Sequence, residues 1–242
     1  YMFELHERLI VLEDDLKTSP YFLDYMNNAL DIYCNDPKVC QVSGYSYLES
    51  YLSDTYLEST YFLLGGDCLA WGTWKRAWTN YCDDSRLLLS KIREKSSLGE
   101  FNRNHSYPFS RLLSDNINTQ KSWAINWLAS TYLLDMLTLY PKKSLARHCT
   151  DSSEQGTNYN LTDNDPLAVP LSFDHIPIAK IDTTALPKLE SYYQSFLKKY
   201  RIPLRKKLTQ KSFKFAGILV KYFKLIVHFL FSSLQYFLLL KK

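Results

Sequence analysis

The chain has 242 residues, 46% of them apolar and 15% aromatic, which suffices for a substantial core and excludes wholesale disorder and collagen-like or linker composition. Its five cysteines form no Cys-x-x-Cys pair, which argues against a disulfide scaffold or zinc ribbon and favours a reducing cytosol. The net charge of +4 is unevenly divided. Residues 1–197 hold 17 Lys and Arg against 25 Asp and Glu, whereas residues 198–242 hold 12 Lys and Arg and no acid. This asymmetry indicates a basic tail with an anionic partner.

The first part of the chain predicts a strand–helix–strand unit. Leu9–Leu12 is a short, wholly apolar run, typical of a strand that is buried on both faces. Ser19 and Pro20 suit the start of a helix, and apolar side chains at helical spacing continue it over residues 20–35. Residues 39–42 are predicted as the next strand. We therefore expect a βαβ unit in an α/β fold.

The rest of the body alternates loops, helices and strands. Residues 44–60 are rich in Tyr, Ser and acid and are predicted as a long loop. Residues 71–78, which follow an apolar run and Gly65-Gly66-Asp67, are predicted to open a helix. Further helices are expected at 84–95, 108–116, 122–135 and 186–200, and a further strand at 137–140.

The strongest chemical signal is Glu13-Asp14-Asp15, directly after the first apolar strand. Ligands of open α/β sheets bind beyond the carboxyl ends of the strands, so these carboxylates are expected to face a crevice. Three adjacent acids repel one another unless a cation or solvent screens them. Mg²⁺ or Mn²⁺, held by one or two carboxylates and by diphosphate oxygens, fits this arrangement. The alternative interpretation is a solvated acidic turn.

Three ordered blocks carry a family resemblance. Residues 11–16 with Ser19-Pro20 resemble the metal-motif segment of GT-A-type glycosyltransferases, both N-acetylglucosaminyltransferases with a Glu-Asp-Asp motif and bacterial transferases of polysaccharide gene clusters. The other two blocks are similar to the bacterial group: Gly66-Asp67-Cys68 with Trp71–Trp78, and Ser122–Trp127 with Leu137–Pro141. Together they span residues 8–160.

The resemblance implies the C-terminal part of a GT-A domain, which holds the metal and acceptor half, over residues 1–180. A basic, amphipathic helical tail is expected over 181–242. Relatives carry upstream strands that bind the nucleotide base. Because this chain begins with Tyr and shows no signal peptide, we expect it to be an N-terminally truncated piece that binds donor poorly by itself.

The resemblance also implies roles for individual residues. Asp15 would be the metal ligand, with Mn²⁺ or Mg²⁺ as cofactor, and Glu13 and Asp14 would bind the nucleotide-sugar donor. Relatives have an acid, the catalytic base, in or just before the third block, where this chain has Lys121 and Ala124.

Asp67 and Asp115 are the substitutes that the sequence offers for this base. The alternatives are a helix-start cap for Asp67 and a solvated acid at a helix end for Asp115.

Two further side chains have weaker support. Trp71, at a predicted helix start, is a candidate to line the acceptor cleft, and its alternative is a place in the core. Relatives have an Asp-x-x-Gly-Thr-His-like run after the late strand, and this chain has Asn158 where the His would fall. His148 lies nearby as another source of an imidazole, against the alternative of a packed histidine.

The tail over residues 198–242 combines lysines and arginines with apolar and aromatic residues. Its uninterrupted apolar stretch is shorter than the roughly 20 residues needed to span a bilayer. An amphipathic helix on an anionic membrane surface is the favoured interpretation, a helix docked on the acidic body is the alternative, and nucleic acid is not expected as a partner.

Together with these features, the resemblance implies a glycosyltransferase of surface polysaccharide synthesis that moves a sugar from a nucleotide-sugar donor to a glycan or lipid-linked acceptor. It is expected in the cytoplasm, peripheral at the inner face of the membrane. Two alternatives stay open: a non-catalytic relative that binds glycan or membrane, and a metal-dependent phosphohydrolase.

Overall fold

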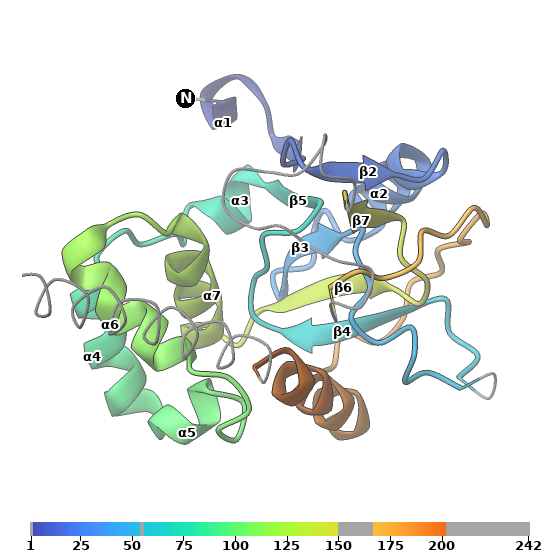
Figure 1. The fold of residues 1–242 in the computed structure, drawn as a ribbon. Helices are drawn as coiled ribbons and strands as arrows, with labels where there is room; N and C mark the ends of the chain where they lie inside the picture. Colours follow the sequence, from blue (N-terminus) through green and yellow to red (C-terminus); the bar gives the residue numbers. More distant parts are fainter. Residues whose placement is uncertain (1, 54–55, 150–166, 202–242) are drawn as a thin grey trace, which may run out of the picture. The chain divides into compact units, whose positions relative to one another are not determined.

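The computed structural model describes residues 2–53, 56–149 and 167–201 (Figure 1). Within them, five strands form a mixed sheet accompanied by helices, so the predicted α/β class is confirmed. β3 and β6 run parallel, whereas the other neighbouring strands pair antiparallel. Across the sheet the order is β1 (Arg8–Val11), β5 (Trp71–Trp74), β3 (Val39–Ser43), β6 (Leu137–Pro141) and β4 (Thr60–Leu64). A second, two-stranded sheet consists of β2 (Leu16–Thr18) and β7 (Ala146–His148).

The predicted strand–helix–strand unit is present, but its two strands are not neighbours. α2 (Phe22–Ile32) lies between β1 and β3 in the chain, and β5 inserts between these strands, antiparallel to both. Gly72 allows the close approach, because a Cβ there would lie 3.0 Å from Met26 Cε and 3.1 Å from the carbonyl oxygen of Leu9. Within the described sheet β1 is therefore an edge strand, and it is half-buried rather than buried on both faces.

The prediction of a helix that opens at Trp71 is wrong for its first half. Trp71–Trp74 are the buried strand β5, and only α3 (Lys75–Trp78) is helical. Trp74 has extended backbone angles (φ −110°, ψ 153°), and its indole nitrogen donates to the carbonyl oxygen of Leu30 at 3.1 Å. Pairing with β1 and β3 decides the conformation here, since tertiary context overrides a local helical pattern.

The helices predicted at 84–95, 108–116 and 122–135 are confirmed. They gather beside the sheet (Figure 1) and share a core of their own around Leu88, Ile92 and Leu113. The side chains of Asp84 and Ser122 accept backbone N–H groups at the starts of two of them, which explains where these helices begin. The helices of this group are α4 (Ser85–Lys95), α5 (Leu98–Phe101), α6 (Phe109–Thr119) and α7 (Trp123–Leu133).

Residues 187–201 form a helix, close to the predicted 186–200. Leu189, Phe196 and Leu197 of this helix are buried in a cluster with Tyr47 and Tyr140. The sequence places a domain boundary at residue 180, whereas the compact unit runs from Tyr1 to Tyr200, because this helix belongs to its core.

The predicted membrane-binding tail lies outside the described residues from residue 202 onward. In the part of the chain that the structure describes, no helix has both the length and the apolar character needed to cross a bilayer.

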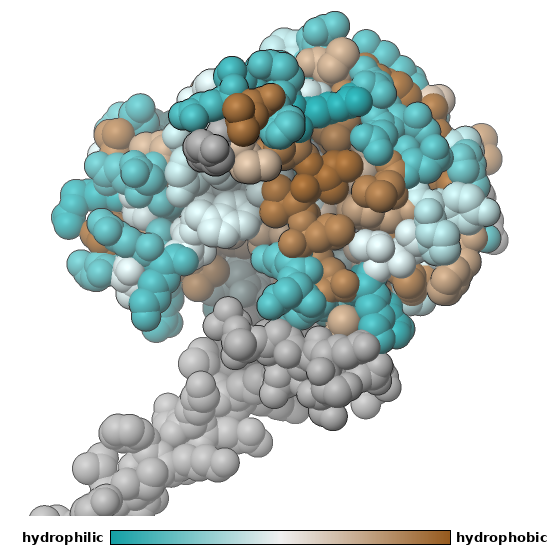
Figure 2. Space-filling model, turned by 90° about the horizontal axis from the view of Figure 1, so that it is seen from above, coloured by the Kyte–Doolittle hydropathy of each residue, from teal (hydrophilic) through white to brown (hydrophobic). Residues whose placement is uncertain are grey.

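The end of the molecule that carries α1 (Met2–Leu5) and β2 has an apolar surface. Figure 2 looks onto this end and shows hydrophobic side chains gathered in the middle of the face, with hydrophilic ones around them. Exposed apolar side chains of this part of the chain include Met2, Leu5 and Leu12, and Leu12 is 46% exposed. The apolar run that leads to the acidic triplet thus remains partly in contact with solvent.

Candidate functional site

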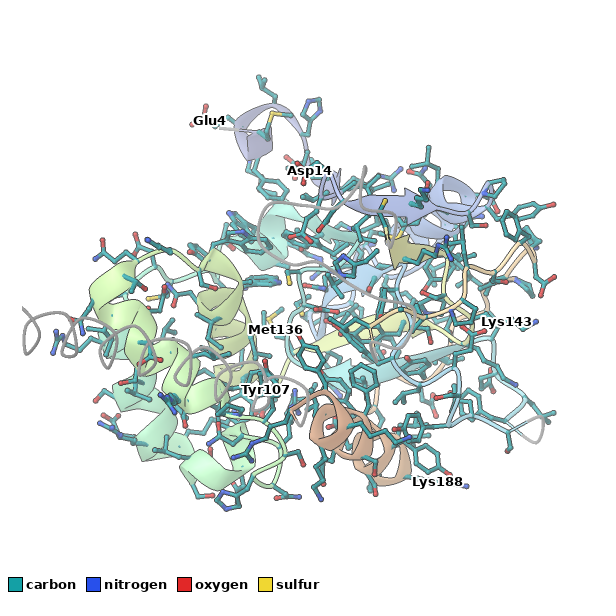
Figure 3. The ribbon with its side chains drawn as sticks, viewed as in Figure 1. Glu4, Asp14, Tyr107, Met136, Lys143 and Lys188 are labelled. Carbon is teal, nitrogen blue, oxygen red and sulfur yellow. The ribbon has the colours of Figure 1, made fainter. Side chains whose placement is uncertain are left out.

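The acidic triplet lies in the turn between β1 and β2. β1 ends at Val11 and β2 begins at Leu16, so Glu13, Asp14 and Asp15 follow a strand end, as predicted. Figure 3 shows Asp14 on the side of the molecule that carries α1 and β2. The carbonyl oxygen of Asp15 accepts a hydrogen bond from the backbone N–H of Cys149 at 2.8 Å, which ties the turn to the end of β7.

Asp67 is brought to this triplet from the loop between β4 and β5. Glu13 reaches the surface, yet its pKa is raised to about 7, first by partial desolvation and then by the negative charges of Asp15, Asp67 and Asp14. The negative charges of three other carboxylates therefore act on Glu13, although more than fifty residues separate it from Asp67. A carboxylate whose pKa is raised by burial and by neighbouring acids is typical of sites that bind a cation or transfer a proton.

Two tyrosine hydroxyls hold the carboxylate of Asp67. Tyr47 donates to Oδ1 at 3.1 Å, Tyr140 donates to Oδ2 at 3.2 Å, and the backbone N–H of Cys68 donates to Oδ1 at 2.7 Å. Burial raises the pKa of Asp67 to about 6, and these hydrogen bonds partly oppose that rise. The alternative of a helix-start cap is wrong, because the strand β5 rather than a helix follows this loop.

A buried amide positions the backbone of the same loop. Gln41 Oε1 accepts hydrogen bonds from the backbone N–H of Asp67 at 3.1 Å and from the indole nitrogen of Trp127. Among the described residues, neither Gln41 Nε2 nor the indole nitrogen of Trp71 has a hydrogen-bond partner, although both side chains are buried. Unpaired buried donors are rare in folded proteins, and one of these two belongs to the side chain that holds the backbone of Asp67.

His148 lies beside the triplet. Its Nδ1 is 3.6 Å from Asp15 Oδ2, and both side chains are largely buried, with 11% and 19% exposed. β2 and β7 pair Leu16 with His148, which places the imidazole next to the acidic turn. The β2–β7 pairing therefore brings the imidazole of His148 to the acidic triplet.

The donor set for a metal ion is small. Among the described residues, no group of three or more His, Cys, Asp or Glu side chains is placed to hold a metal. The structure brings together Asp15, its neighbour His148 and the exposed Glu13. Mg²⁺ in nucleotide sites is held by one or two carboxylates plus phosphate oxygens and water. These side chains therefore fit a divalent ion only in a site that takes most of its ligands from a bound diphosphate and water.

Asp115 lies elsewhere. It is an exposed residue of α6 whose carboxylate is 3.8 Å from Arg111 Nε, one helical turn away. It is not among the charged groups that shift the pKa of Glu13 or Asp67. The structure thus brings Asp67, and not Asp115, to the triplet.

Trp71 is buried in β5 rather than exposed at a helix start. Its ring stacks on Trp123 with a centroid distance of 5.3 Å, and it is only 4% exposed. Trp123, at the first position of α7, is 38% exposed. The aromatic side chain that faces solvent in this region is therefore Trp123, with Trp71 behind it.

Sequence reasoning missed Tyr47, Tyr140 and Gln41 as parts of the site. The hydroxyl of Tyr47, in a loop, and that of Tyr140, in β6, both donate to the carboxylate of Asp67. Gln41 lies in the middle of the buried strand β3. A polar residue inside an apolar strand and the tyrosine-rich loop over 44–60 were the available signals. Neither identifies a partner, because the contacts join positions far apart in the chain.

The chain matches no protein-family model, and a search of curated proteins finds no match for it.

Proposed function

We propose that this chain is part of a metal-dependent glycosyltransferase that moves a sugar from a nucleotide-sugar donor to a glycan or lipid-linked acceptor. The observation that carries the proposal is the convergence of Asp67 on the triplet Glu13-Asp14-Asp15 at the end of β1. The first two sequence blocks that resemble GT-A enzymes thereby meet at one place in the fold.

Asp15 and His148 support the proposed metal and donor end of the site. Asp15 would hold Mn²⁺ or Mg²⁺, with Glu13 and Asp14 close to the donor. A divalent ion in such a site stabilises the negative charge of the departing nucleoside diphosphate. The repulsion that Glu13 experiences from the three other acids would favour binding of a cation, because a positive charge relieves it.

Asp67 is the stronger of the two proposed bases. An inverting transferase needs a carboxylate to accept the proton of the acceptor hydroxyl. Asp67 is near enough to Glu13 for its charge to raise the pKa of Glu13, and the hydroxyls of Tyr47 and Tyr140 fix the orientation of the Asp67 carboxylate. Asp115, in its exposed pair with Arg111, has no comparable support.

The decisive experiment measures Mn²⁺-dependent binding and hydrolysis of a panel of nucleotide sugars by the full-length protein and by Asp15→Ala. We expect the variant to lose donor hydrolysis and to bind Mn²⁺ at least about tenfold more weakly. Asp174→Ala is the matched control, since Asp174 is an exposed acid that pairs with Lys143 on the surface. Equal hydrolysis by Asp15→Ala and the parent protein would remove the metal role of Asp15.

A second candidate is a relative that binds the donor or a glycan without turning it over. Lys121 motivates it, because the resemblance places an acid at or near this position and the lysine is exposed beside α7. Tight, Mn²⁺-dependent donor binding with no transfer and no hydrolysis would favour this candidate. Release of phosphate from simple esters would instead favour a phosphohydrolase.

The basic segment 198–242 is proposed to bring the protein to an anionic membrane surface. We expect the full chain to sediment with vesicles that contain anionic lipid and not with neutral vesicles, and to be released as salt rises, because charge attraction is screened. Equal binding to both kinds of vesicle would contradict an electrostatic anchor.

A further inference from the structure

A polar hollow lies between the loop after α3, the first turn of α4 and the connection from α6 to α7. Its volume is about 700 Å³, within the range of small-molecule sites. The residues that line it and matter for its chemistry are Tyr81, Asp83, Arg86, Lys121, Trp123 and Asn126. The sequence predicts none of these as a ligand contact: Lys121 is there only the residue in place of the relatives' acid, and Trp123 and Asn126 are only parts of the third block.

Two aromatic rings, Trp123 and Tyr81, line the hollow, and each packs against another aromatic ring. Trp123 is 38% exposed and stacks on the buried Trp71, with a centroid distance of 5.3 Å. Tyr81 stacks on Trp78 with a centroid distance of 4.7 Å and an angle of 2° between the ring planes. Both rings are held in place by other rings, so they present fixed apolar surfaces to the hollow.

Buried amides and a hydroxyl fix its floor. Ser85 Oγ donates to Asn126 Oδ1 at 2.7 Å, and Asn116 Nδ2 donates to Ser85 Oγ at 3.0 Å. Asn126 Nδ2 donates to the carbonyl oxygen of Asp83 at 2.9 Å, which anchors the loop that carries this acid. A satisfied, buried polar network of this kind holds the surrounding groups in one arrangement.

Charged groups of both signs line the rim. Asp83, Arg86 and Lys121 are exposed, and their side chains make no hydrogen bond or ion pair with the other residues that the structure describes. Together they offer donors from the two cations and acceptors from the carboxylate. The two acids Asp83 and Asp84 balance the cations Arg86 and Lys121, so the rim has no net positive charge that would favour a diphosphate, whereas a neutral, hydroxylated ring can use donors and acceptors alike.

The hollow is connected to the acidic site through Trp71. The β1–β5 register places Trp71 opposite Val11, two residues before Glu13. Trp71 therefore links the two places: its strand pairs with the strand that precedes the triplet, and its buried ring supports Trp123 at the hollow.

We propose that this hollow binds the saccharide acceptor, with a sugar ring packed on Trp123 and its hydroxyls bonded to Asp83, Arg86 and Lys121. An aromatic platform, a rim of donors and acceptors and a rigid floor are what a hydroxylated ring with an apolar face requires. This inference rests on the proposed function for the identity of the ligand as an acceptor. The binding itself does not depend on turnover.

The test measures binding of the methyl glycosides of N-acetylglucosamine, galactose and glucuronic acid to the full-length protein, by saturation-transfer NMR and titration. We expect at least one glycoside to bind, and Trp123→Ala to weaken it about tenfold or more. Asp83→Ala is a second variant with the same expected direction, and it keeps the backbone carbonyl that anchors Asn126. Phe173→Ala is the matched control, because Phe173 is an aromatic residue that is 67% exposed elsewhere on the surface.

The two variants distinguish the proposed saccharide site from the proposed transferase activity. We expect Asp15→Ala to lose donor hydrolysis while it still binds glycoside, and Trp123→Ala to weaken glycoside binding about tenfold or more. Glycoside binding that depends on Trp123 and Asp83 in a protein without any transfer or hydrolysis would refute the enzyme and keep the saccharide site. If no glycoside binds, or if Trp123→Ala and Asp83→Ala bind as the parent does, the saccharide site is refuted.

Discussion

Asp67 illustrates how the surroundings of one side chain set its charge. The loop that carries it is held by Gln41, and its carboxylate is enclosed by Tyr47 and Tyr140, so water is largely replaced by three hydrogen-bond donors. Burial outweighs these donors, and the pKa rises from 3.8 to about 6. The folded protein therefore holds a proton on Asp67 more tightly than the unfolded chain does.

This predicts how stability depends on pH. Below about pH 4, Asp67 is protonated in both states. Between that pH and about 6 the unfolded chain loses the proton first, so the free energy of unfolding falls as pH rises, by up to about 3 kcal/mol. Urea titrations between pH 4 and 7 measure this fall. Asp67→Asn should reduce it, and the exposed Asp115→Asn should not; an undiminished fall in Asp67→Asn would contradict the assignment.

Gly66 predicts a steric effect in the same loop. A Cβ at this position would lie 2.4 Å from Trp127 Nε1, a buried ring atom that cannot move freely. We expect Gly66→Ala to lower the free energy of unfolding by about 1 to 3 kcal/mol, because it overpacks the core, and to change the near-ultraviolet circular dichroism of tryptophan.

Gly99→Ala is the matched control. Its Cβ would meet the ring of His105 at 2.7 Å, and this side chain is exposed, whereas the indole of Trp127 is fully buried. A cost for Gly66→Ala no larger than that for Gly99→Ala would show that Trp127 adapts to the added methyl group.

At the scale of elements, a buried ion pair fastens the helix over 187–201 to the rest of the compact unit. Arg103 Nη1 lies 3.3 Å from Glu190 Oε2, and the two side chains are only 6% and 17% exposed. Both also bind the end of β4: Glu190 Oε1 accepts from the N–H of Leu64 at 2.9 Å, and Arg103 donates to its carbonyl oxygen. The pair thus joins a strand, a loop and a helix that are distant in sequence.

Removal of one partner should cost more than removal of both. Glu190→Ala leaves the guanidinium of Arg103 buried without its carboxylate, and we expect a loss of about 3 to 5 kcal/mol in urea unfolding. The double variant Arg103→Met with Glu190→Leu should lose less, because no uncompensated charge remains. Asp174→Ala, which breaks the exposed pair with Lys143, should change stability by less than about 1 kcal/mol. A double variant as unstable as Glu190→Ala would argue against charge burial as the cause.

At the scale of the whole molecule, the sheet order predicts where the fold is most resistant to opening. β3 and β6 have a paired strand on each side and are fully buried, whereas β1 pairs only with β5 among the described strands. Strands with two partners open only in large unfolding events.

Hydrogen exchange followed by mass spectrometry measures this directly. We expect peptides that cover Val39–Ser43 and Leu137–Pro141 to exchange slowest, and peptides that cover Arg8–Val11 to exchange orders of magnitude faster. Protection of β1 equal to that of β3 would indicate that its outer edge is covered in solution.

Much of the local structure was predictable from the sequence. The helices over 84–95, 108–116 and 122–135 were predictable because apolar spacing and capping residues such as Asp84 and Ser122 act within a few positions of one another. The turn of Glu13-Asp14-Asp15 at a strand end was also predictable, because an apolar run of strand length directly precedes it.

Tertiary structure alone decided the arrangement around that turn. β5 replaced a predicted helix and inserted between β1 and β3, because pairing on both sides outweighs the propensity of a four-residue segment. Asp67, His148 and the hydroxyls of Tyr47 and Tyr140 meet near the triplet through contacts that span tens of residues. Their proximity depends on which strands lie side by side, and no pattern within a short segment of sequence carries that information.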